Sequence, residues 1–174
     1  EMVIRDWSSD VCSSDLKTVL IDADLRRPTL HEKLKIVNSV GLSNYMVRNV
    51  SSKEILRKTD IDNLWFIPAG PILPNSSELI ESGVLDELIE ELKGNFDYVI
   101  IDSTPAGLVA DASLMVKYAS FILLVCRNEY TRKDVFTDVL NLFQTNNINN
   151  FDIVFNDLNL KKSRYGRYDN YYKQ

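Results

Sequence analysis

The sequence predicts an α/β fold in which a mostly parallel sheet carries helices on both faces. Short apolar runs alternate along the chain with segments of helical periodicity, which is the pattern of repeated strand–helix–strand units. Within each run the apolar residues are nearly continuous, as expected for parallel strands buried on both faces. With 174 residues, 45% of them hydrophobic, the chain is long enough to bury one such core.

The apolar runs give the expected strands, and apolar residues at three- and four-residue steps give the expected helices. The strands are residues 18–21, 64–67, 96–102, 121–126 and 151–155. The helices are residues 31–36, 54–58, 79–92, 112–118 and 131–143, with 41–46 a loop or a short helix. Gly83 should interrupt the helical segment 79–92, which should end at Gly94. Ser51 with Glu54, and Thr131 with Asp134, have the spacing of helix N-terminal caps. The stretch 68–74 holds three prolines and should be a stiff loop.

Two of the expected strands end on carboxylates. The first run stops at Asp22, with Asp24 two residues further on, and another run stops at Asp102. Side chains two apart in a strand share a face, and open α/β sheets bind ligands at the carboxyl ends of their strands. These acids are therefore the candidate site. The alternative is a plain helix entry, in which Asp24 caps whatever follows Pro28.

Residues 1–16 are expected to lie outside the native domain, because residues 6–16 resemble one reading frame of a sequencing-adapter oligonucleotide. The alternative is a genuine polar arm. The remaining residues carry 19 basic and 21 acidic side chains, a net charge of −2. A nearly neutral domain lacks the electrostatic footprint of a nucleic-acid-binding protein. The sequence also contains no run that resembles a membrane span or a signal peptide.

The cysteines and the single histidine form no metal-binding or nucleophile pattern. Cys12 and Cys126 do not have metal-ligand spacing, and Cys126 lies within an apolar run, so a buried, reduced thiol is expected. His31 has no cysteine or second histidine nearby, and it is expected to be a surface helix residue. A cytosolic compartment fits this cysteine usage.

The last fourteen residues, 161–174, differ from everything before them. They hold five bases and one acid, a net charge of +4, and four of the eight tyrosines: Tyr165, Tyr168, Tyr171 and Tyr172. No aliphatic residue follows Leu160, so a flexible tail is expected. The tail could stack on single-stranded nucleic acid or present tyrosine hydroxyls to an enzyme, and its composition leaves both open.

The two acidic strands resemble the Walker A′ and Walker B segments of deviant P-loop ATPases, the MinD/ParA-like superfamily. Within that group, residues 17–174 resemble the cytoplasmic domain of bacterial tyrosine kinases of capsule and exopolysaccharide biosynthesis. The resemblance implies a P-loop NTPase-like fold, with residues 17–160 a partial kinase domain and 161–174 the tyrosine tail. It rests on a series of short segments in order: Leu20–Pro28, Gly41–Ser43, Pro68–Asn75, Glu78–Leu79, Tyr98–Pro105, Asp111–Ala112, Asn156 and the tyrosine cluster.

The resemblance implies ATP and Mg²⁺ as cofactors, and it implies a role for each candidate residue. Asp102 would hold Mg²⁺ with help from Asp24, and Asp22 or Asp24 would orient and deprotonate an incoming tyrosine hydroxyl. Phosphoryl transfer depends mainly on positioning and charge neutralisation, which carboxylate-held Mg²⁺ supplies. The other implied residues are Arg26 and Arg27 flanking the phosphate crevice, Asn156 reading adenine, and Tyr165, Tyr168, Tyr171 and Tyr172 as autophosphorylation sites.

One motif of that family does not occur in these 174 residues. There is no Gly-x-x-x-x-Gly-Lys-Ser/Thr loop, whose backbone amides and lysine cradle the nucleotide phosphates. We therefore expect the Walker A strand, loop and helix to be missing before Lys17, with poor ATP binding, no kinase activity and marginal stability as consequences. Ser103-Thr104-Pro105 stands where the family often has a threonine and two prolines, and it retains the hydroxyls.

Two other functions stay open at this point. One is a MinD/ParA-type partitioning ATPase, and the other is a non-catalytic scaffold that binds a membrane adaptor or a polymerase component. The tyrosine cluster favours the kinase, because ATPases of that type often end in a membrane-binding amphipathic helix. The kinase hypothesis implies a transmembrane adaptor, in the same or a separate chain, a homo-oligomer, and a cytoplasmic location at the inner face of the plasma membrane. No nucleic-acid partner is expected.

Overall fold

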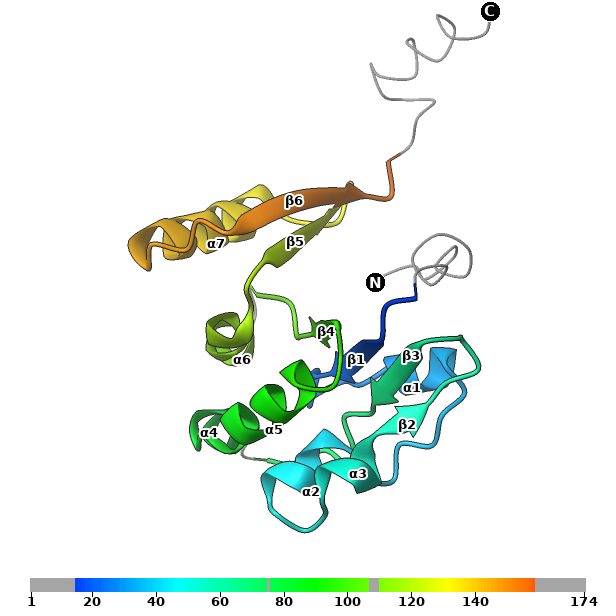
Figure 1. Cartoon of the computed structure of the whole chain (residues 1–174). Helices are drawn as coiled ribbons and strands as arrows, with labels where there is room; N and C mark the ends of the chain where they lie inside the picture. Colours follow the sequence, from blue (N-terminus) through cyan, green and yellow to red (C-terminus); the bar gives the residue numbers. More distant parts are fainter. Residues whose placement is uncertain (1–14, 75, 107–109, 159–174) are drawn as a thin grey trace, which may run out of the picture. The chain divides into compact units, whose positions relative to one another are not determined.

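The computed structural model describes residues 15–74, 76–106 and 110–158, with residues 110 and 111 described by their backbone alone (Figure 1). The tail 161–174 and residues 1–14 fall outside the described part. Contacts divide the chain into two compact units, residues 1–118 and 119–174. Within the described ranges, no helix is both long enough and apolar enough to cross a membrane.

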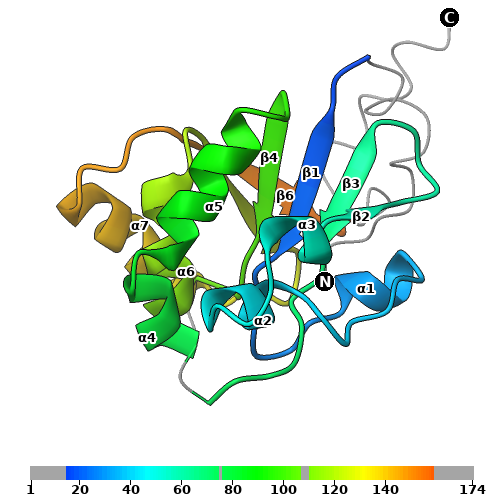
Figure 2. The same cartoon turned by 60° about the horizontal axis from the view of Figure 1, so that its bottom comes forward.

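A four-stranded sheet forms the centre of the first unit. Its strands are β1 (Thr18–Asp22), β2 (Arg57–Lys58), β3 (Leu64–Ile67) and β4 (Tyr98–Asp102), in the spatial order β2-β3-β1-β4. Strand β1 lies between β3 and β4 and is parallel to both, whereas β2 pairs antiparallel with β3 at the edge (Figure 2). The mostly parallel sheet predicted from the apolar runs is confirmed.

Strands β1 and β3 are largely buried on both faces, which explains why these two strands are continuously apolar. Val19 and Ile21 of β1 belong to the larger hydrophobic cluster, whereas Leu20 belongs to a second cluster that includes Leu30. Because successive side chains of a strand point to opposite faces, the two clusters lie on opposite faces of the sheet. Helices therefore cover both faces, as the sequence predicted.

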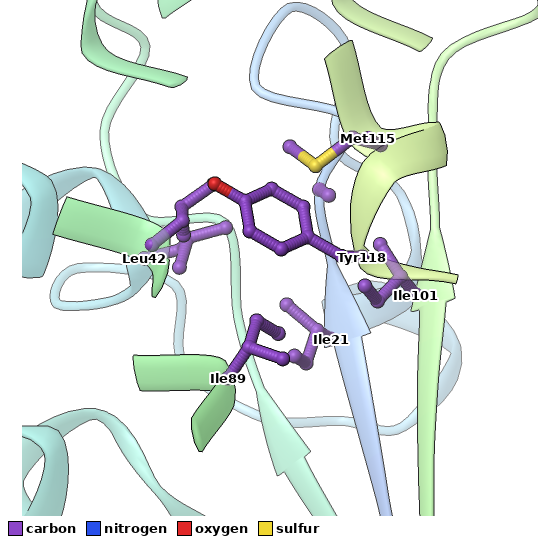
Figure 3. Close-up of a pocket in the computed structure, with 8 residues that line it drawn as sticks. Ile21, Leu42, Ile89, Ile101, Met115 and Tyr118 are labelled. Atoms are coloured by element: carbon purple, nitrogen blue, oxygen red, sulfur yellow. The ribbon is translucent and has the colours of Figure 1, made fainter. Parts of the chain in front are cut away.

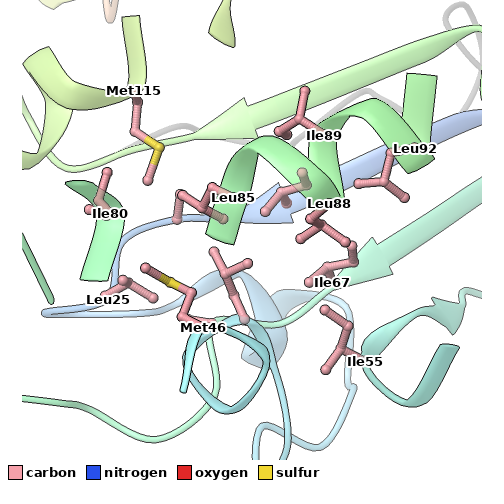
Figure 4. Packing of buried hydrophobic residues seen from close by; sticks show 14 of the residues in the cluster. Leu25, Met46, Ile55, Ile67, Ile80, Leu85, Leu88, Ile89, Leu92 and Met115 are labelled. Atoms are coloured by element: carbon pink, nitrogen blue, oxygen red, sulfur yellow. The ribbon is translucent and has the colours of Figure 1, made fainter. Parts of the chain in front are cut away.

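Six α-helices and one short 3₁₀ helix accompany the described sheet of the first unit. They are α1 (Leu30–Lys33), α2 (Leu42–Met46), α3 (Ser52–Ile55), α4 (Ser76–Glu81), α5 (Val84–Lys93), α6 (Ala110–Met115) and η1 (Val116–Tyr118). Helix α5 packs Leu85, Leu88, Ile89 and Leu92 into the larger cluster (Figure 4). Gly83, with a φ of 82°, separates α4 from α5, and the predicted interruption is confirmed.

Two helix predictions of the first unit are wrong in their extent. The capping box at Ser51 forms, since its backbone N–H donates to Glu54 Oε2 at 2.9 Å, but α3 ends at Ile55. The next residues, predicted to be helical, form β2 because they pair with β3. Helix α1 likewise stops at Lys33, short of the predicted end at residue 36, and Lys35 adopts a positive φ of 55°.

The second unit contains a two-stranded parallel sheet of β5 (Ile122–Arg127) and β6 (Phe151–Asn156), with α7 (Lys133–Thr145) between them in sequence. Phe143 of α7 packs edge-to-face on Phe151 with ring centroids 5.1 Å apart. Cys126 is a buried free thiol, as predicted, and burial raises its pKa. The predicted cap is wrong: α7 has Arg132 at its N-cap, and Thr131 Oγ1 accepts the N–H of Arg127 instead.

Candidate active site

Two carboxylates end adjacent parallel strands and lie side by side. Asp22 of β1 and Asp102 of β4 are partners in the strand register. The pairing extends one residue further, because the N–H of Ala23 donates to the backbone oxygen of Asp102 at 2.7 Å. The sheet thus brings together, at one edge, acids that are 80 residues apart in sequence. This is the edge at which open α/β sheets bind their ligands.

Asp22 is fully buried and incompletely hydrogen-bonded. Its side chain has no exposed surface, and its Oδ1 accepts the N–H of Asp24 at 3.3 Å. Its Oδ2 has no hydrogen-bond partner among the described residues. Burial raises the pKa of Asp22 to about 7, and the negative charge of Asp102 adds to the rise. A carboxyl group kept in this environment needs either a proton or a cation close to it.

Asp24 organises the turn that follows β1. Its Oδ1 accepts two backbone N–H groups, from Arg26 at 3.1 Å and from Arg27 at 2.9 Å. The alternative prediction, in which Asp24 caps the helix that follows Pro28, is wrong, because the N-cap residue of α1 is Thr29. Asp24 is half-buried, so its side chain reaches the surface, whereas that of Asp22 does not.

The two arginines of this turn are exposed at the same edge of the sheet. Arg26 donates from Nη2 to Ser77 Oγ of α4 at 3.4 Å, which ties the turn to that helix. Arg27 is also exposed. Exposed guanidinium groups next to the ends of β1 and β4 can attract a phosphate-bearing ligand, since guanidinium binds phosphate through paired N–H donors.

Asp102 carries a raised pKa as well. Burial is the main cause, the charge of Asp24 adds to it, and the positive charge of Lys33 opposes it. Three acids thus share one edge of the sheet, and the pKa values of two of them are raised by burial and by the neighbouring negative charge. The electrostatics of the site favour a bound cation.

The residues fit Mg²⁺ held in the manner usual for nucleotide sites. No group of three or more protein ligands that could enclose a metal ion occurs among the described residues. Mg²⁺ commonly takes only one or two carboxylates and completes its octahedron with water and substrate phosphates. Asp102 together with Asp24 offers such a partial set, and the unpartnered buried oxygen of Asp22 lies next to them in sequence and register.

Thr104 belongs to the same edge, and the sequence analysis gave it no role. It is 5% exposed, and its Oγ1 is buried without a hydrogen-bond partner among the described residues. The neighbouring Ser103 uses its hydroxyl locally, donating to the backbone oxygen of Thr104 at 3.3 Å. A buried hydroxyl without a partner calls for a water or a ligand. The sequence feature that could have identified Thr104 as a site residue is its position two residues after Asp102, the acidic end of a predicted strand.

Two loops that support this edge are joined by hydrogen bonds. The N–H groups of Leu42 and Ser43, at the start of α2, donate to the backbone oxygens of Pro68 and Ala69 at 2.7 and 2.8 Å. Asn38 adds a two-way bond across the same junction, accepting the N–H of Gly70 at 2.7 Å and donating to its oxygen at 3.2 Å. The segments 41–43 and 68–70, separate in sequence, therefore form one support.

Replacing Gly41 with alanine should destabilise the protein. A Cβ atom at Gly41 would lie 2.1 Å from the backbone oxygen of Pro68 and 2.5 Å from the N of Gly70, so the backbone would have to move. Overpacking of this kind costs about 1–3 kcal/mol. Urea denaturation of the variant should show this loss. Gly94→Ala is the matched control, because a Cβ there meets nothing closer than 3.5 Å. Equal stability of the two variants would contradict the close approach.

The other predicted residues have different positions. Asn156 is the last residue of β6 and belongs to the second unit. His31 is half-buried in α1, and its Nδ1 has no partner among the described residues, so it is less exposed than predicted. The tyrosines Tyr165, Tyr168, Tyr171 and Tyr172 lie outside the described residues.

A small cavity lies beneath the acidic edge, in the larger hydrophobic cluster. It measures about 10 Å³ and is lined mainly by aliphatic side chains, among them Ile21, Ile89 and Met115 (Figure 3). A cavity this small and apolar has room for no more than about one water molecule. The cavity offers no room for a substrate.

Comparison with known families and proteins identifies related chains. The family model AAA_31, described as an AAA domain, matches residues 6–159 and so begins within the segment 1–16. Tyrosine-protein kinase CpsD of Streptococcus pneumoniae is 32% identical over 157 residues, which cover 89% of this chain and 69% of the relative. Tyrosine-protein kinase CpsD of Streptococcus agalactiae is 29% identical over 165 residues, covering 94% of this chain and 72% of the relative.

The fold also matches solved structures. The crystal structure of the chimerical protein CapA2B2 superposes with a TM-score of 0.79 and 31% sequence identity. The match covers 84% of this chain and 65% of that one, so this chain spans slightly less than two thirds of the solved protein.

Proposed function

The chain belongs to the AAA_31 family and is similar to bacterial tyrosine-protein kinases, and we propose that it is an ATP-dependent protein-tyrosine kinase domain. Such a kinase would act on tyrosines of its own tail and regulate polysaccharide polymerisation and export. The observation that carries the proposal is the pair of strand ends, Asp22 and Asp102, which are register partners at the ligand-binding edge of a parallel sheet.

The geometry divides the proposed roles among the three acids. Asp102 and Asp24 would hold Mg²⁺, which would neutralise developing charge on the transferred phosphoryl group. Of the two candidates for orienting and deprotonating the tyrosine hydroxyl, Asp24 is half-buried and reaches the surface, whereas Asp22 is fully buried. We therefore assign the substrate contact to Asp24. Asp22 positions it by accepting its N–H.

Arg26 and Arg27 are the proposed phosphate contacts of the first unit, and the role of Asn156 in the second unit is proposed separately, from its match to the family. Arg26 and Arg27 follow the Asp24 turn and are exposed, which suits contacts with phosphate oxygens. Asn156 would read adenine, as its match to the family implies. Each of these assignments can be tested by a single substitution in a chain that binds nucleotide.

The tail provides the proposed acceptor and the proposed switch. Residues 161–174 carry a net charge of +4 and four tyrosines, and each phosphate adds nearly two negative charges at neutral pH. Phosphorylation in trans would therefore reverse the charge of the tail and could release neighbouring subunits of a homo-oligomer. A transmembrane adaptor, in the same or a separate chain, would hold the domain at the inner face of the plasma membrane.

The 174-residue chain itself should bind ATP poorly. Its sequence contains no Gly-x-x-x-x-Gly-Lys-Ser/Thr loop to supply backbone amides and a lysine to the phosphates. Calorimetric titration with Mg²⁺-ATP should show no saturable binding at micromolar nucleotide. Micromolar affinity, accompanied by a cooperative thermal transition, would show that the described residues bind nucleotide without this loop.

The kinase proposal is best tested in a chimera. A strand, a Gly-x-x-x-x-Gly-Lys-Thr loop and a helix would be placed before Lys17, and the purified protein incubated with ATP and Mg²⁺. Mass spectrometry should find phosphate on Tyr165, Tyr168, Tyr171 and Tyr172, and chelation of Mg²⁺ should abolish it. A chimera that binds and hydrolyses ATP but leaves every tyrosine unmodified would contradict the kinase and support a partitioning-type ATPase.

A further inference from the structure

Thr104, in the loop that follows β4, has a side chain that is turned into the protein. It is 5% exposed, whereas its neighbours Ser103 and Pro105 are both exposed. The loop therefore directs two side chains outward and one inward. In this way it removes the hydroxyl of Thr104 from bulk water while it leaves the side chain of Ser103 at the surface.

The buried hydroxyl of Thr104 differs from that of a structural threonine. Its Oγ1 has no hydrogen-bond partner among the described residues. Thr59, by contrast, donates from Oγ1 to the backbone oxygen of Leu64 at 2.9 Å and accepts the N–H of Ile61 at 3.1 Å. Burying a hydroxyl without replacing its hydrogen bonds to water is unfavourable, so such a group normally binds an ordered water or a ligand.

Chain connectivity places this hydroxyl next to the acidic edge of the sheet. Thr104 is two residues after Asp102, and Asp102 is the register partner of Asp22. Asp22 Oδ2 is a second buried oxygen at this edge that has no partner among the described residues. A hydroxyl oxygen has two lone pairs that can accept hydrogen bonds, and an ionised carboxylate only accepts them. This edge therefore suits a ligand that donates hydrogen bonds.

A hydrated divalent cation is a ligand of this kind. Asp22, Asp24 and Asp102 place three acids at the edge, which attract a positive ion. Mg²⁺ gives up its water reluctantly, so it usually keeps several bound waters and takes only one or two carboxylates from a protein. Those waters donate hydrogen bonds to outer-shell groups, which fix the orientation of the ligands around the metal.

We propose that the hydroxyl of Thr104 accepts a hydrogen bond from a water molecule bound to the Mg²⁺ ion of this edge, and so positions that water. The inference rests on the proposed function, in which Asp102 holds the ion, and it adds one residue to the three acids. Thr104 is a positioning residue, because it acts through a water and does not touch the metal. Its role requires the hydroxyl and not the methyl group.

The test uses Mn²⁺ as the probe, because it prefers the same oxygen ligands as Mg²⁺ and is paramagnetic. Mn²⁺ would be titrated into the 174-residue chain, and electron paramagnetic resonance would measure the free ion. Thr104→Val, which replaces the hydroxyl with a methyl group, should weaken binding by about tenfold or more, the usual effect of losing an outer-shell partner. Thr104→Ser should bind Mn²⁺ like the parent, because it keeps the hydroxyl.

A stability measurement separates this role from a purely structural one. Without metal, Thr104→Val should resist urea at least as well as the parent, because it removes a buried hydroxyl that no described residue binds. Thr137→Val is the matched control, since its hydroxyl lies at the surface of α7 and donates to the backbone oxygen of Lys133 at 2.8 Å. This control variant should leave Mn²⁺ binding unchanged.

The dependence on Asp102 locates the bound ion. Asp102→Asn should weaken Mn²⁺ binding, and Thr104→Val should then have little further effect, because the positioned water belongs to the ion that Asp102 holds. Three results would overturn the inference: equal Mn²⁺ affinity of the parent and Thr104→Val, no saturable Mn²⁺ binding to the parent, or a Thr104→Val chain that is destabilised in the absence of metal.

Failure of this inference is distinguishable from failure of the kinase proposal. If Thr104→Val leaves the Mn²⁺ affinity unchanged and the chimera phosphorylates its tail, Thr104 has no role at the metal and the kinase proposal stands. If Thr104→Val weakens Mn²⁺ binding and the chimera leaves every tyrosine unmodified, the role of Thr104 stands and the kinase proposal is wrong.

Discussion

Replacing Asp22 with asparagine should raise the free energy of unfolding by up to about 4 kcal/mol above pH 7, and by almost nothing near pH 4. Asp22 is fully buried, and its folded-state pKa is raised from 3.8 to about 7, first by burial and then by Asp102. The folded chain therefore binds the proton more tightly than the unfolded chain. Its contribution to stability is greatest below pH 3.8 and is lost as the pH rises through about 7.

Urea denaturation of the metal-free and nucleotide-free chain over this pH range would measure the effect. The asparagine variant should have a flatter pH profile than the parent, and the two curves should converge on the acidic side. Asp60→Asn, at an exposed turn residue, is the matched control for the loss of one negative charge and should follow the parent. A destabilised Asp22→Asn variant at high pH would show that the ionised carboxylate has a partner, and would contradict its isolation.

Replacing Asp102 with asparagine in the chimera should lower the rate of tyrosine phosphorylation by about 100-fold or more, because metal-assisted charge neutralisation is worth several kcal/mol. The substitution preserves shape and removes the charge through which Mg²⁺ would be held. Burial already raises the pKa of Asp102, so the neutral side chain should not destabilise the fold. A loss of rate would then reflect the chemistry.

Quantitative mass spectrometry of the tail tyrosines, with thermal denaturation in parallel, would check this result. Asp138→Asn changes an exposed acid of α7 and should leave the rate unchanged. An Asp102→Asn chimera that folds normally and phosphorylates its tail at the parental rate would remove Asp102 from the proposed metal site. The same measurement on Asp24→Asn would show whether the turn acid shares that role.

The acidic strand ends are a feature that could be predicted from the sequence alone. The apolar runs at residues 18–21 and 96–102 stop on acids, and this pattern was sufficient to predict two strands ending alike. The pattern is local, because a parallel strand buried on both faces must be apolar along its length whatever its partners are. The amphipathic helix α5 and its interruption at Gly83 were predictable for the same reason, since their periodicity is contained within a single element.

Two of the errors arise where a competing hydrogen-bond partner overrides a helical signal. Arg57 and Lys58 continue a helical spacing but form β2, because the edge of β3 offers backbone partners. Thr131 has the spacing of a helix cap, but its hydroxyl accepts the N–H of Arg127. In both cases another hydrogen-bond partner, on β3 for β2 and within the same loop for Thr131, outweighs a helical preference worth well under about 1 kcal/mol per residue.

The sequence by itself determined the α/β class, the order of the elements and the acidic residues that form the candidate site. Only the structure decided that Asp24 holds the turn that contains the arginines, and that a buried oxygen of Asp22 and the buried hydroxyl of Thr104 have no partner among the residues it describes. The residue types of a segment and its hydrophobic periodicity can be read from that segment alone. Its burial, its hydrogen-bond partners and hence its pKa depend on which other segments fold against it.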